Sequence, residues 1–302
     1  MLDLNWDNIE TKLPSANTYK KYEGDSRFWK ISKNEQGKGV AIIRLLIDKN
    51  STPTVRLYTY SLKKPNPFVP GKFLWFISNS PDSIGLPDPV KEKYNELLAS
   101  NQVDLAKSTL RRNTKYITNI LVVKDPANPE NDGKVFLWEF GTKLQAKISS
   151  WENPSEDDLS IGAKPKKLFN PLAGHNIKLM LTPQGDFGTY DSTEVMPDVT
   201  SIKEGIEKDD AIKFIIENTH DLNEFKEPAF FDSYEVLSEK FNKWWTGGKG
   251  DSAQAPKEYS TVEKLQPKAP IVDIDDFEMP TEAKPSTKQA PDAEDDSWLN
   301  DL

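Results

Sequence analysis

The sequence contains no cysteine, and this absence excludes a disulfide framework, a thiol nucleophile and a zinc site built on thiolates. Its two histidines, His175 and His220, lie far apart and lack the paired spacing of metal ligands. A Gly-rich phosphate-binding loop and a Gly-x-Ser-x-Gly elbow are also missing from the sequence. We therefore expect a protein that is not an enzyme and that uses no metal or cofactor.

Long apolar runs are missing as well. The longest, such as residues 120–123, are far too short to cross a bilayer, and residues 1–7 lack the basic and apolar regions of a signal peptide. The hydrophobic fraction of 36% lies below the norm of about 45–50% for globular proteins. We expect a soluble protein that is made in a cytoplasm, with no membrane partner and with part of its chain outside any packed core.

Charge is unevenly distributed along the chain. Residues 1–150 carry 23 Lys/Arg and 16 Asp/Glu, a net +7, whereas residues 151–250 and 251–302 each carry a net −8. The overall net charge of −9 therefore hides a basic half. A basic half joined to an acidic end is an asymmetry that nucleic-acid-binding proteins carry.

The composition divides the chain into three regions. Residues 1–24 are polar with one short amphipathic stretch, and we interpret them as an N-terminal arm that is a candidate for self-association. Residues 25–250 alternate short apolar runs with turn residues and form the predicted core. Residues 251–302 are rich in proline and acidic residues and too polar to offset the entropy of ordering, so we expect a disordered acidic tail.

Short apolar runs bounded by turn residues predict strands within the core. They lie at 39–46, 55–60, 72–77, 116–123, 135–140 and 177–181. The loop 125–133 is dense in turn residues and predicts a hairpin between its two flanking strands. Helical periodicity predicts one helix near 90–99 and two between 201 and 245. We expect a mainly β fold with helices (α+β), in which an OB-fold Greek-key barrel carries an inserted helical subdomain and C-terminal helices.

Cations and an aromatic residue meet at the start of one predicted strand. Arg111, Arg112, Lys115 and Tyr116 combine charges that neutralise phosphates with a ring that can stack on an unpaired base. In the run 135–140 both strand faces are apolar, so one face around Trp138 could be a stacking platform. Composition alone favours the alternative that these aromatic residues are ordinary core residues.

Arg44 lies inside the apolar run 42–46. It could be an edge residue whose charged end reaches solvent, or it could contact a phosphate or a base. The pattern leaves both alternatives open.

Residues 116–136 closely resemble the single-stranded DNA-binding (helix-destabilising) proteins of T-even phages. The likeness includes the loop Asp125-Pro126-Ala127-Asn128-Pro129-Glu130-Asn131-Asp132-Gly133. Similar blocks recur in the same order at 29–30, 41–44, 185–191, 233–241 and 299–302. The resemblance therefore covers about residues 27–248 and the extreme C-terminus.

This resemblance implies an OB-fold core that holds single-stranded DNA in a basic, aromatic cleft, binds cooperatively, and recruits replication and recombination proteins through an acidic tail. The residues that it places in the cleft are Arg44, Arg111, Arg112, Tyr116, Trp138, Phe187 and Tyr190. The partner-binding residues that it implies at the C-terminus are Trp298, Leu299, Asp301 and Leu302.

The sequence departs from the family pattern at several positions. Asp88 and Lys91 stand where the family has the cysteines of a zinc site, so we expect this subdomain to be zinc-free and held by packing. Glu139 stands where the pattern has a cation, and Ile117 where it has tryptophan. The basic motif that the family carries near its N-terminus has no counterpart near Met1. The basic pair in this region, Lys20-Lys21, lies further along the chain.

Together these features favour a phage protein that coats single-stranded DNA during replication, recombination and repair, in the cytoplasm of the infected bacterial host. One alternative is an OB-fold RNA-binding protein or chaperone, because stacking and phosphate contacts do not exclude a 2′-hydroxyl. A second alternative is a protein-interaction module without affinity for nucleic acid.

Overall fold

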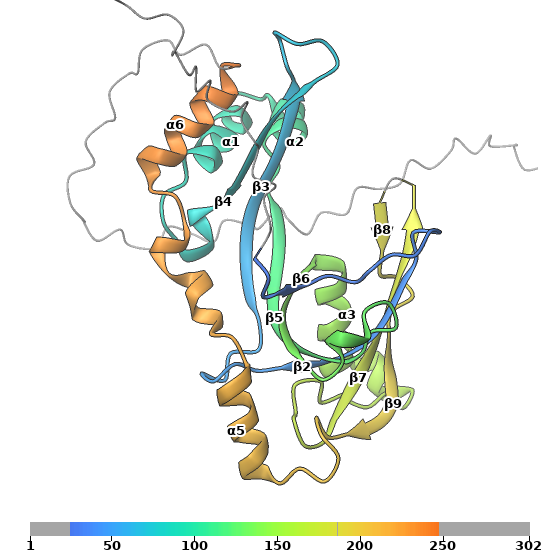
Figure 1. Ribbon diagram of the computed structural model, residues 1–302. Coiled ribbons are helices and arrows are strands. Elements are labelled where there is room, and N and C mark those ends of the chain that lie inside the picture. Colours follow the sequence, from blue (N-terminus) through green and yellow to red (C-terminus); the bar gives the residue numbers. More distant parts are fainter. Residues whose placement is uncertain (1–24, 186, 248–302) are drawn as a thin grey trace, which may run out of the picture. The chain divides into compact units, whose positions relative to one another are not determined.

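The computed structural model of the chain describes residues 25–185 and 187–247 (Figure 1). The predicted arm at 1–24 and the predicted tail at 251–302 lie outside the described residues. The strands are β1 (Phe28–Trp29), β2 (Gly39–Leu46), β3 (Val55–Pro65), β4 (Phe73–Asn79), β5 (Asn113–Lys124), β6 (Val135–Gly141), β7 (Gly174–Gln184), β8 (Phe187–Thr189) and β9 (Glu194–Thr200). The helices are α1 (Pro89–Ala99), α2 (Val103–Thr109), α3 (Thr142–Glu152), α4 (Glu156–Ser160), α5 (Lys208–Asn218) and α6 (Tyr234–Trp245), and the 3-10 helices are η2 (Pro81–Ile84), η3 (Pro129–Asn131), η4 (Leu222–Lys226) and η5 (Pro228–Phe230).

Within the described residues, the strands form one nine-stranded sheet. Its main path is β1-β6-β5-β2-β7-β8, while β3 joins β5 to β4 and β9 joins β7. Every ladder is antiparallel except the one between β1 and β6. Strand β2 pairs with β7 through its first half and with β5 through its second, and its register shifts between Ile42 and Ile43. The sheet with its several helices confirms the predicted mixed α+β class.

Local sequence signals determine where the helices begin. Asp88 caps α1 by accepting hydrogen bonds from the backbone N–H groups of Val90 and Lys91, and Pro89 follows at the first helical position. Ser233 caps α6 in the same way, through Val236. Along α6, Leu237, Phe241 and Trp244 are spaced as one helical face, and all three are buried.

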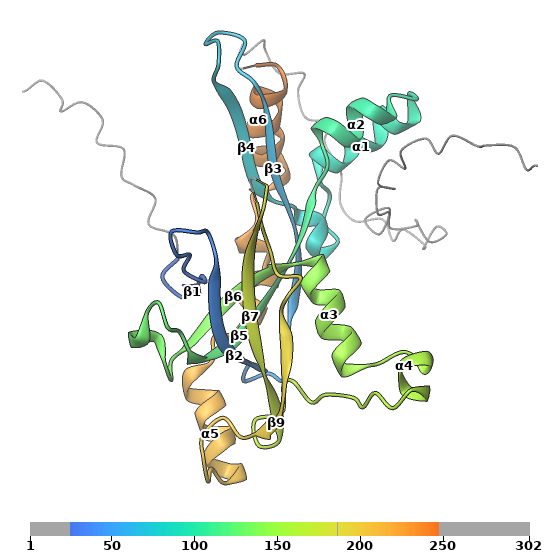
Figure 2. The ribbon, with the colours of Figure 1, turned by 90° about the vertical axis from the view of Figure 1, so that its right-hand side faces the viewer.

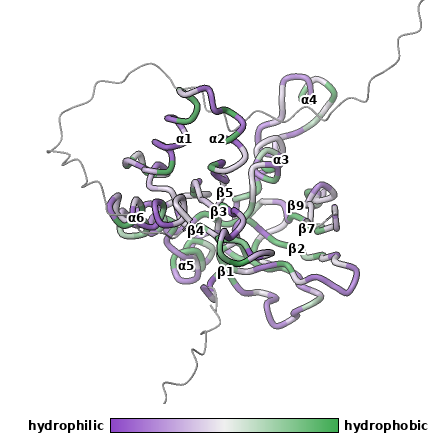
Figure 3. Tube along the Cα trace, turned by 90° about the horizontal axis from the view of Figure 1, so that it is seen from above, coloured by the Kyte–Doolittle hydropathy of each residue, from purple (hydrophilic) through white to green (hydrophobic). Residues whose placement is uncertain are grey.

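Three hydrophobic clusters hold the described residues together. The first lies among β2, β5, β6 and β7, where alternate residues such as Ala41, Ile43 and Leu45 are inaccessible to solvent. The second packs α1, α2 and α6 against one face of the hairpin formed by β3 and β4. Figure 3 shows green, apolar stretches along the strands and helices that alternate between green and purple. The buried residues of the helices face the strands in these clusters.

The third cluster explains why both faces of β6 are apolar. Leu137 points away from the first cluster and packs with Leu57, Ile117, Leu222 and Phe225. The segment 222–231 covers Leu137, while Trp138 and Phe140 on the opposite face are buried in the first cluster. Neither face of β6 is open at these residues, so the interpretation of one face around Trp138 as an open stacking platform is wrong.

The predicted elements are largely confirmed. Strands β5 and β6 form the predicted antiparallel hairpin, and α1 occupies the predicted helix near 90–99. Helices α5 and α6 are the two expected between 201 and 245. Helices α2, α3 and α4 were not predicted.

Candidate nucleic-acid interface

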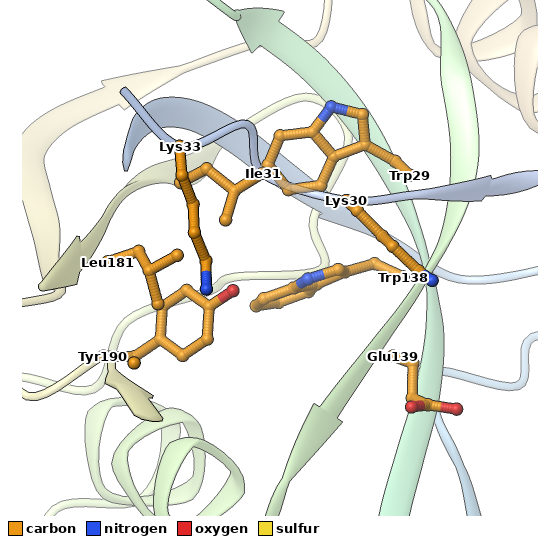
Figure 4. A pocket seen from close by; sticks show the side chains of 9 residues that line it. Trp29, Lys30, Ile31, Lys33, Trp138, Glu139, Leu181 and Tyr190 are labelled. Atoms are coloured by element: carbon orange, nitrogen blue, oxygen red, sulfur yellow. The ribbon is translucent and has the colours of Figure 1, made fainter. Parts of the chain in front are cut away.

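A pocket of about 280 Å³ opens beside β6 (Figure 4). Its lining comes from β1 and the residues after it, from β6, from β7 and from the region of β8. The lining residues are Trp29, Lys30, Ile31, Lys33, Trp138, Glu139, Leu181, Gly188 and Tyr190. Two of the predicted site residues, Trp138 and Tyr190, therefore meet here. The pocket joins aromatic rings to cations, which is the combination that single-strand binding uses.

Four aromatic rings form a continuous row that leads to this pocket. The ring of Tyr116 stacks on Phe140 with a centroid separation of 5.8 Å, and Phe140 lies 4.7 Å from Trp138. Trp138 in turn meets Tyr190 edge-on at 6.4 Å. The two middle rings belong to the core, whereas Tyr116 and Tyr190 at the ends are half-buried. A base could therefore reach an aromatic face at either end of the row but not at its centre.

Pairing of β1 with β6 brings the cations to the pocket. Trp29 lies opposite Trp138 in this parallel ladder, so the following residues Lys30 and Lys33 border the pocket with exposed side chains. The indole N–H of Trp29 donates a hydrogen bond of 3.0 Å to the carboxylate of Asp125, and this bond fixes the orientation of the ring. Lysines placed here can neutralise the phosphates of a strand whose bases contact the rings.

Gly188 of β8 lies close to the side chain of Leu181 on β7. A Cβ atom at Gly188 would lie 2.6 Å from Cδ1 of Leu181, which also lines the pocket. Gly188 and Tyr190, two residues later, both line the pocket. Burial raises the pKa of the Tyr190 phenol above its ordinary value, so this ring carries no charge that would repel a phosphate at neutral pH.

An acidic residue at the rim is paired with one of the predicted cations. Glu139 lines the pocket, and its carboxylate forms a 2.7 Å ion pair with the Nζ of Lys115. Both side chains are partly exposed, so the pair is weak in water. Lys115 thus compensates the charge of Glu139 in this conformation.

Arg44 lies elsewhere than the sequence suggested. Its side chain is inaccessible to solvent. The guanidinium donates hydrogen bonds to the Asn176 amide oxygen, to the Asn170 carbonyl and to both oxygens of Thr200. Burial lowers the pKa of Arg44 to about 10. This value is still well above neutral pH, so the guanidinium stays protonated there. The prediction that Arg44 contacts DNA is therefore corrected: in this structure it joins β2 to β7 and β9 from inside.

The two other predicted arginines behave differently from each other. Arg111 is exposed. The guanidinium of Arg112 lies over the ring of Tyr58 at 3.6 Å from its centroid and forms an ion pair with Asp82. Arg112 therefore ties β3 to the segment that precedes α1, and it lies outside the pocket lining.

The remaining predicted site residues are not tested by side-chain geometry. Phe187 lies in β8, opposite Gln184 of β7. The predicted partner-binding residues Trp298, Leu299, Asp301 and Leu302 lie outside the described residues. Sequence reasoning missed Lys30 and Lys33 as site residues, although the pair Trp29-Lys30 is part of the family likeness.

Asp88 and Lys91, which stand where the family has zinc-binding cysteines, are both engaged by other groups of the protein. The Asp88 carboxylate is buried and accepts hydrogen bonds from Tyr60 Oη and Ser80 Oγ as well as from the start of α1. Lys91 is a cation paired with Asp82 at 2.7 Å. Within residues 25–185 and 187–247, no cluster of three or more His, Asp or Glu residues could hold a metal ion.

No helix in the described part of the chain is long and apolar enough to span a membrane.

Comparison with known proteins connects this geometry to a family. A protein-family model described as gp32 DNA binding protein like matches residues 37–245. The single-stranded DNA-binding protein of Enterobacteria phage T2 is 31% identical over 289 residues, which are 92% of this chain and 91% of that protein. The protein of the same name from Enterobacteria phage T4 is 31% identical over 290 residues, again 92% and 91% of the two chains. Both relatives are named for DNA binding and not for an enzyme activity. The chain belongs to the family of gp32-like DNA-binding proteins.

Proposed function

We propose that this protein binds single-stranded DNA without sequence preference, through the pocket beside β6. The observation that carries the proposal is the meeting of Trp138 and Tyr190 with Lys30 and Lys33 in one pocket (Figure 4). Every base has a face that can stack on an aromatic ring, and every nucleotide brings a phosphate, so this combination does not depend on sequence. The names of the phage T2 and T4 relatives support the same ligand.

Magnitudes favour stacking and charge as joint contributors. Stacking of one base on an aromatic side chain contributes about 1–3 kcal/mol. Each phosphate neutralised by a lysine or arginine releases counterions, so log K falls with log salt by about 0.7 per contact on single strands. Exposed cations such as Lys30, Lys33 and Arg111 supply the charge, and Tyr116 and Tyr190 supply accessible aromatic faces. Phe187 in β8 is a further proposed contact.

The proposed core is an OB-type barrel spanning residues 25–250. Support comes from β2, which pairs with β5 along one half and with β7 along the other, with a register shift between the halves. Strands that pass from one part of a sheet to another at a bend make the corners of small barrels. The proposed arm at 1–24 and tail at 251–302 flank this core.

The proposed biological role is to coat single-stranded DNA during phage replication, recombination and repair. The site of action would be the cytoplasm of the infected bacterial cell. The arm would mediate self-association along the strand, and the acidic tail, with Trp298, Leu299, Asp301 and Leu302, would recruit replication and recombination proteins. Membership of a family with phage relatives supports this role. The core would work without zinc.

A titration of tryptophan and tyrosine fluorescence with oligo-dT at several salt concentrations tests the proposal. We expect tight binding that weakens as salt rises, with much weaker binding to a duplex of the same length. Equal affinity for duplex, or a salt-independent affinity, would contradict it. An oligo-U arm at the same salt separates DNA binding from the RNA-binding alternative, which requires the stronger affinity for oligo-U. The protein-interaction alternative requires no binding in any arm.

A further inference from the structure

One face of the hairpin formed by β3 and β4 is apolar and uncovered. Along β4, Leu74 and Phe76 pack toward α6, whereas Phe73, Trp75 and Ile77 point the other way and are 51%, 58% and 76% exposed. Helix α6 lies to the left of β4 in Figure 1 and behind the hairpin in Figure 2, so the uncovered face is turned toward the viewer of Figure 2. We call Phe73, Trp75, Ile77 and the neighbouring Lys63 the hairpin face.

An exposed apolar face of this kind favours aggregation unless a ligand covers it. Among the described strands β4 pairs only with β3, so it is an edge strand. An exposed, apolar edge strand promotes aggregation, and natural proteins normally place charges or bulges there. Three successive outward-facing apolar residues on β4 are therefore unusual, and contiguous exposed apolar patches mark interaction sites.

Charge indicates the class of ligand. The hairpin, residues 55–79, contains Arg56, Lys63, Lys64 and Lys72 and no aspartate or glutamate. The ammonium of Lys63 lies 5.5 Å from the ring centroid of Phe73 and 6.0 Å from that of Trp75. A cation held over two exposed rings suits a ligand that carries both negative charge and flat aromatic groups.

The spacing of the rings suits every second nucleotide of a stacked strand. Phe73 and Trp75 are two residues apart on one strand face, a separation of roughly 6.8 Å. This is about twice the 3.4 Å rise per nucleotide of one strand. Each ring can therefore take its own base without competing with its neighbour. A protein partner fits less well, because the buried centres of protein interfaces are depleted in lysine, and here Lys63 lies at the centre of the face.

We propose that the hairpin face is a second contact surface for single-stranded DNA, in which Phe73 and Trp75 stack on bases and Lys63 contacts a phosphate. This surface lies outside the pocket beside β6, since none of its residues lines that pocket. The proposal rests on the proposed function and extends the DNA contacts from the nine-stranded sheet to its β3–β4 hairpin.

Paired variants test the proposal by affinity. The variant Phe73→Ser/Trp75→Ser removes both rings, and Ile212→Ser/Ile216→Ser on α5 is the matched control because its residues are also exposed and apolar. Binding to an oligo-dT of about 16 nucleotides, the upper end of site sizes for one OB fold, is measured for each. We expect the hairpin variant to bind at least about fivefold more weakly, the effect of losing one stacked base, and the control to bind as the wild type does. An unchanged dissociation constant in the hairpin variant overturns the proposal.

Two further readouts separate a DNA contact from a protein interface. Cross-linking with oligo-dT that carries 5-iodouracil should label the peptide that contains Trp75, and labelling confined to pocket peptides overturns the proposal. Lys63→Ala should reduce the steepness of the log K against log salt plot by about 0.7 with an unchanged melting temperature.

If the hairpin variant instead abolishes self-association measured without DNA and keeps the wild-type affinity, the face is an interface between copies of the chain. Failure of the proposed function itself looks different, because the wild type would then bind no oligo-dT.

Discussion

The indole Nε1 of Trp29 donates a hydrogen bond of 3.0 Å to Oδ2 of Asp125, although 96 residues separate them. The same buried carboxylate accepts hydrogen bonds from the Asn131 side chain and from the backbone N–H groups of Ala127 and Asn128. One residue thus fixes both the loop between β5 and β6 and the tryptophan that lines the pocket. The loop that carries the family likeness therefore has a structural role, because it holds one of the tryptophans that line the pocket.

Replacing Asp125 by alanine should destabilise the core and weaken DNA binding together. The change leaves buried donors unpaired, each at a cost of about 1–3 kcal/mol. Urea unfolding monitored by fluorescence measures the loss, and Asp157→Ala on the exposed surface of α4 is the control. Wild-type stability in the Asp125 variant would show that this hydrogen-bond network does not hold Trp29.

The same carboxylate should also make stability depend on pH. Burial opposes its charge, but hydrogen bonds from Asn131, Trp29 and Asn128 outweigh burial and hold the pKa of Asp125 below its ordinary value of 3.8. Its contribution is then complete above the unfolded-state pKa and is lost as the pH falls through the lower folded-state pKa. The stability difference between wild type and Asp125→Asn should therefore shrink below about pH 4. A difference that grows in acid contradicts the assignment.

Arg44→Met should lower stability without changing how DNA binding responds to salt. Its guanidinium serves acceptors on Asn170, Asn176 and Thr200, and removal leaves them buried and unpaired, at about 1–3 kcal/mol each. A phosphate contact would instead add about 0.7 to the slope of log K against log salt. A shallower slope with intact stability would restore Arg44 to the DNA interface.

How far the sequence predicted this structure depends on the distance between interacting residues. The hairpin of β5 and β6 was predictable because its signals, a turn-rich loop between two apolar runs, are local. The position of Arg44 was not, because its acceptors lie 126 to 156 residues away in the sequence. Lys30 and Lys33 reach the pocket only through the parallel pairing of β1 with β6. Neither segment carries a local sequence pattern that predicts this pairing.

Two features of the fold have weak local signals in the sequence. Helix α3 contains Leu144, Ile148 and Trp151 at helical spacing, but the stretch follows directly after β6 and is short enough to pass for a loop. The run 135–140 does not show locally that both faces of β6 are buried, because Trp138 packs among β2, β5 and β7 while Leu222 and Phe225 cover Leu137.

Removal of metal should leave the protein unchanged. Asp88 connects Tyr60, Ser80 and the start of α1 through hydrogen bonds of its carboxylate, and these contacts need no metal ion. Treatment with a chelator should therefore not shift the melting temperature, whereas Asp88→Ala should lower stability by about 1–3 kcal/mol through the lost cap and the unpaired donors. Stoichiometric zinc that leaves with a loss of stability would contradict this account.

Tyr116→Ala should weaken binding to oligo-dT by about 1–3 kcal/mol, as loss of one stacked base does. Tyr116 is half-buried against Phe140, so the variant is compared with Phe140→Leu, which changes the core beneath it. Circular dichroism and urea unfolding are measured on both. If Tyr116→Ala unfolds the protein and shows no separate loss of affinity, the ring belongs to the core alone.

The most direct test of the central claim is the salt dependence of oligo-dT binding by the double variant Lys30→Ala/Lys33→Ala. Both lysines are exposed at the pocket, so their removal should leave the fold intact. If each contacts one phosphate, the slope of log K against log salt should become shallower by about 1.4. The control pair Lys213→Ala/Lys226→Ala, which is exposed outside the pocket, should keep the wild-type slope. A wild-type slope in Lys30→Ala/Lys33→Ala would show that single-stranded DNA does not bind at this pocket.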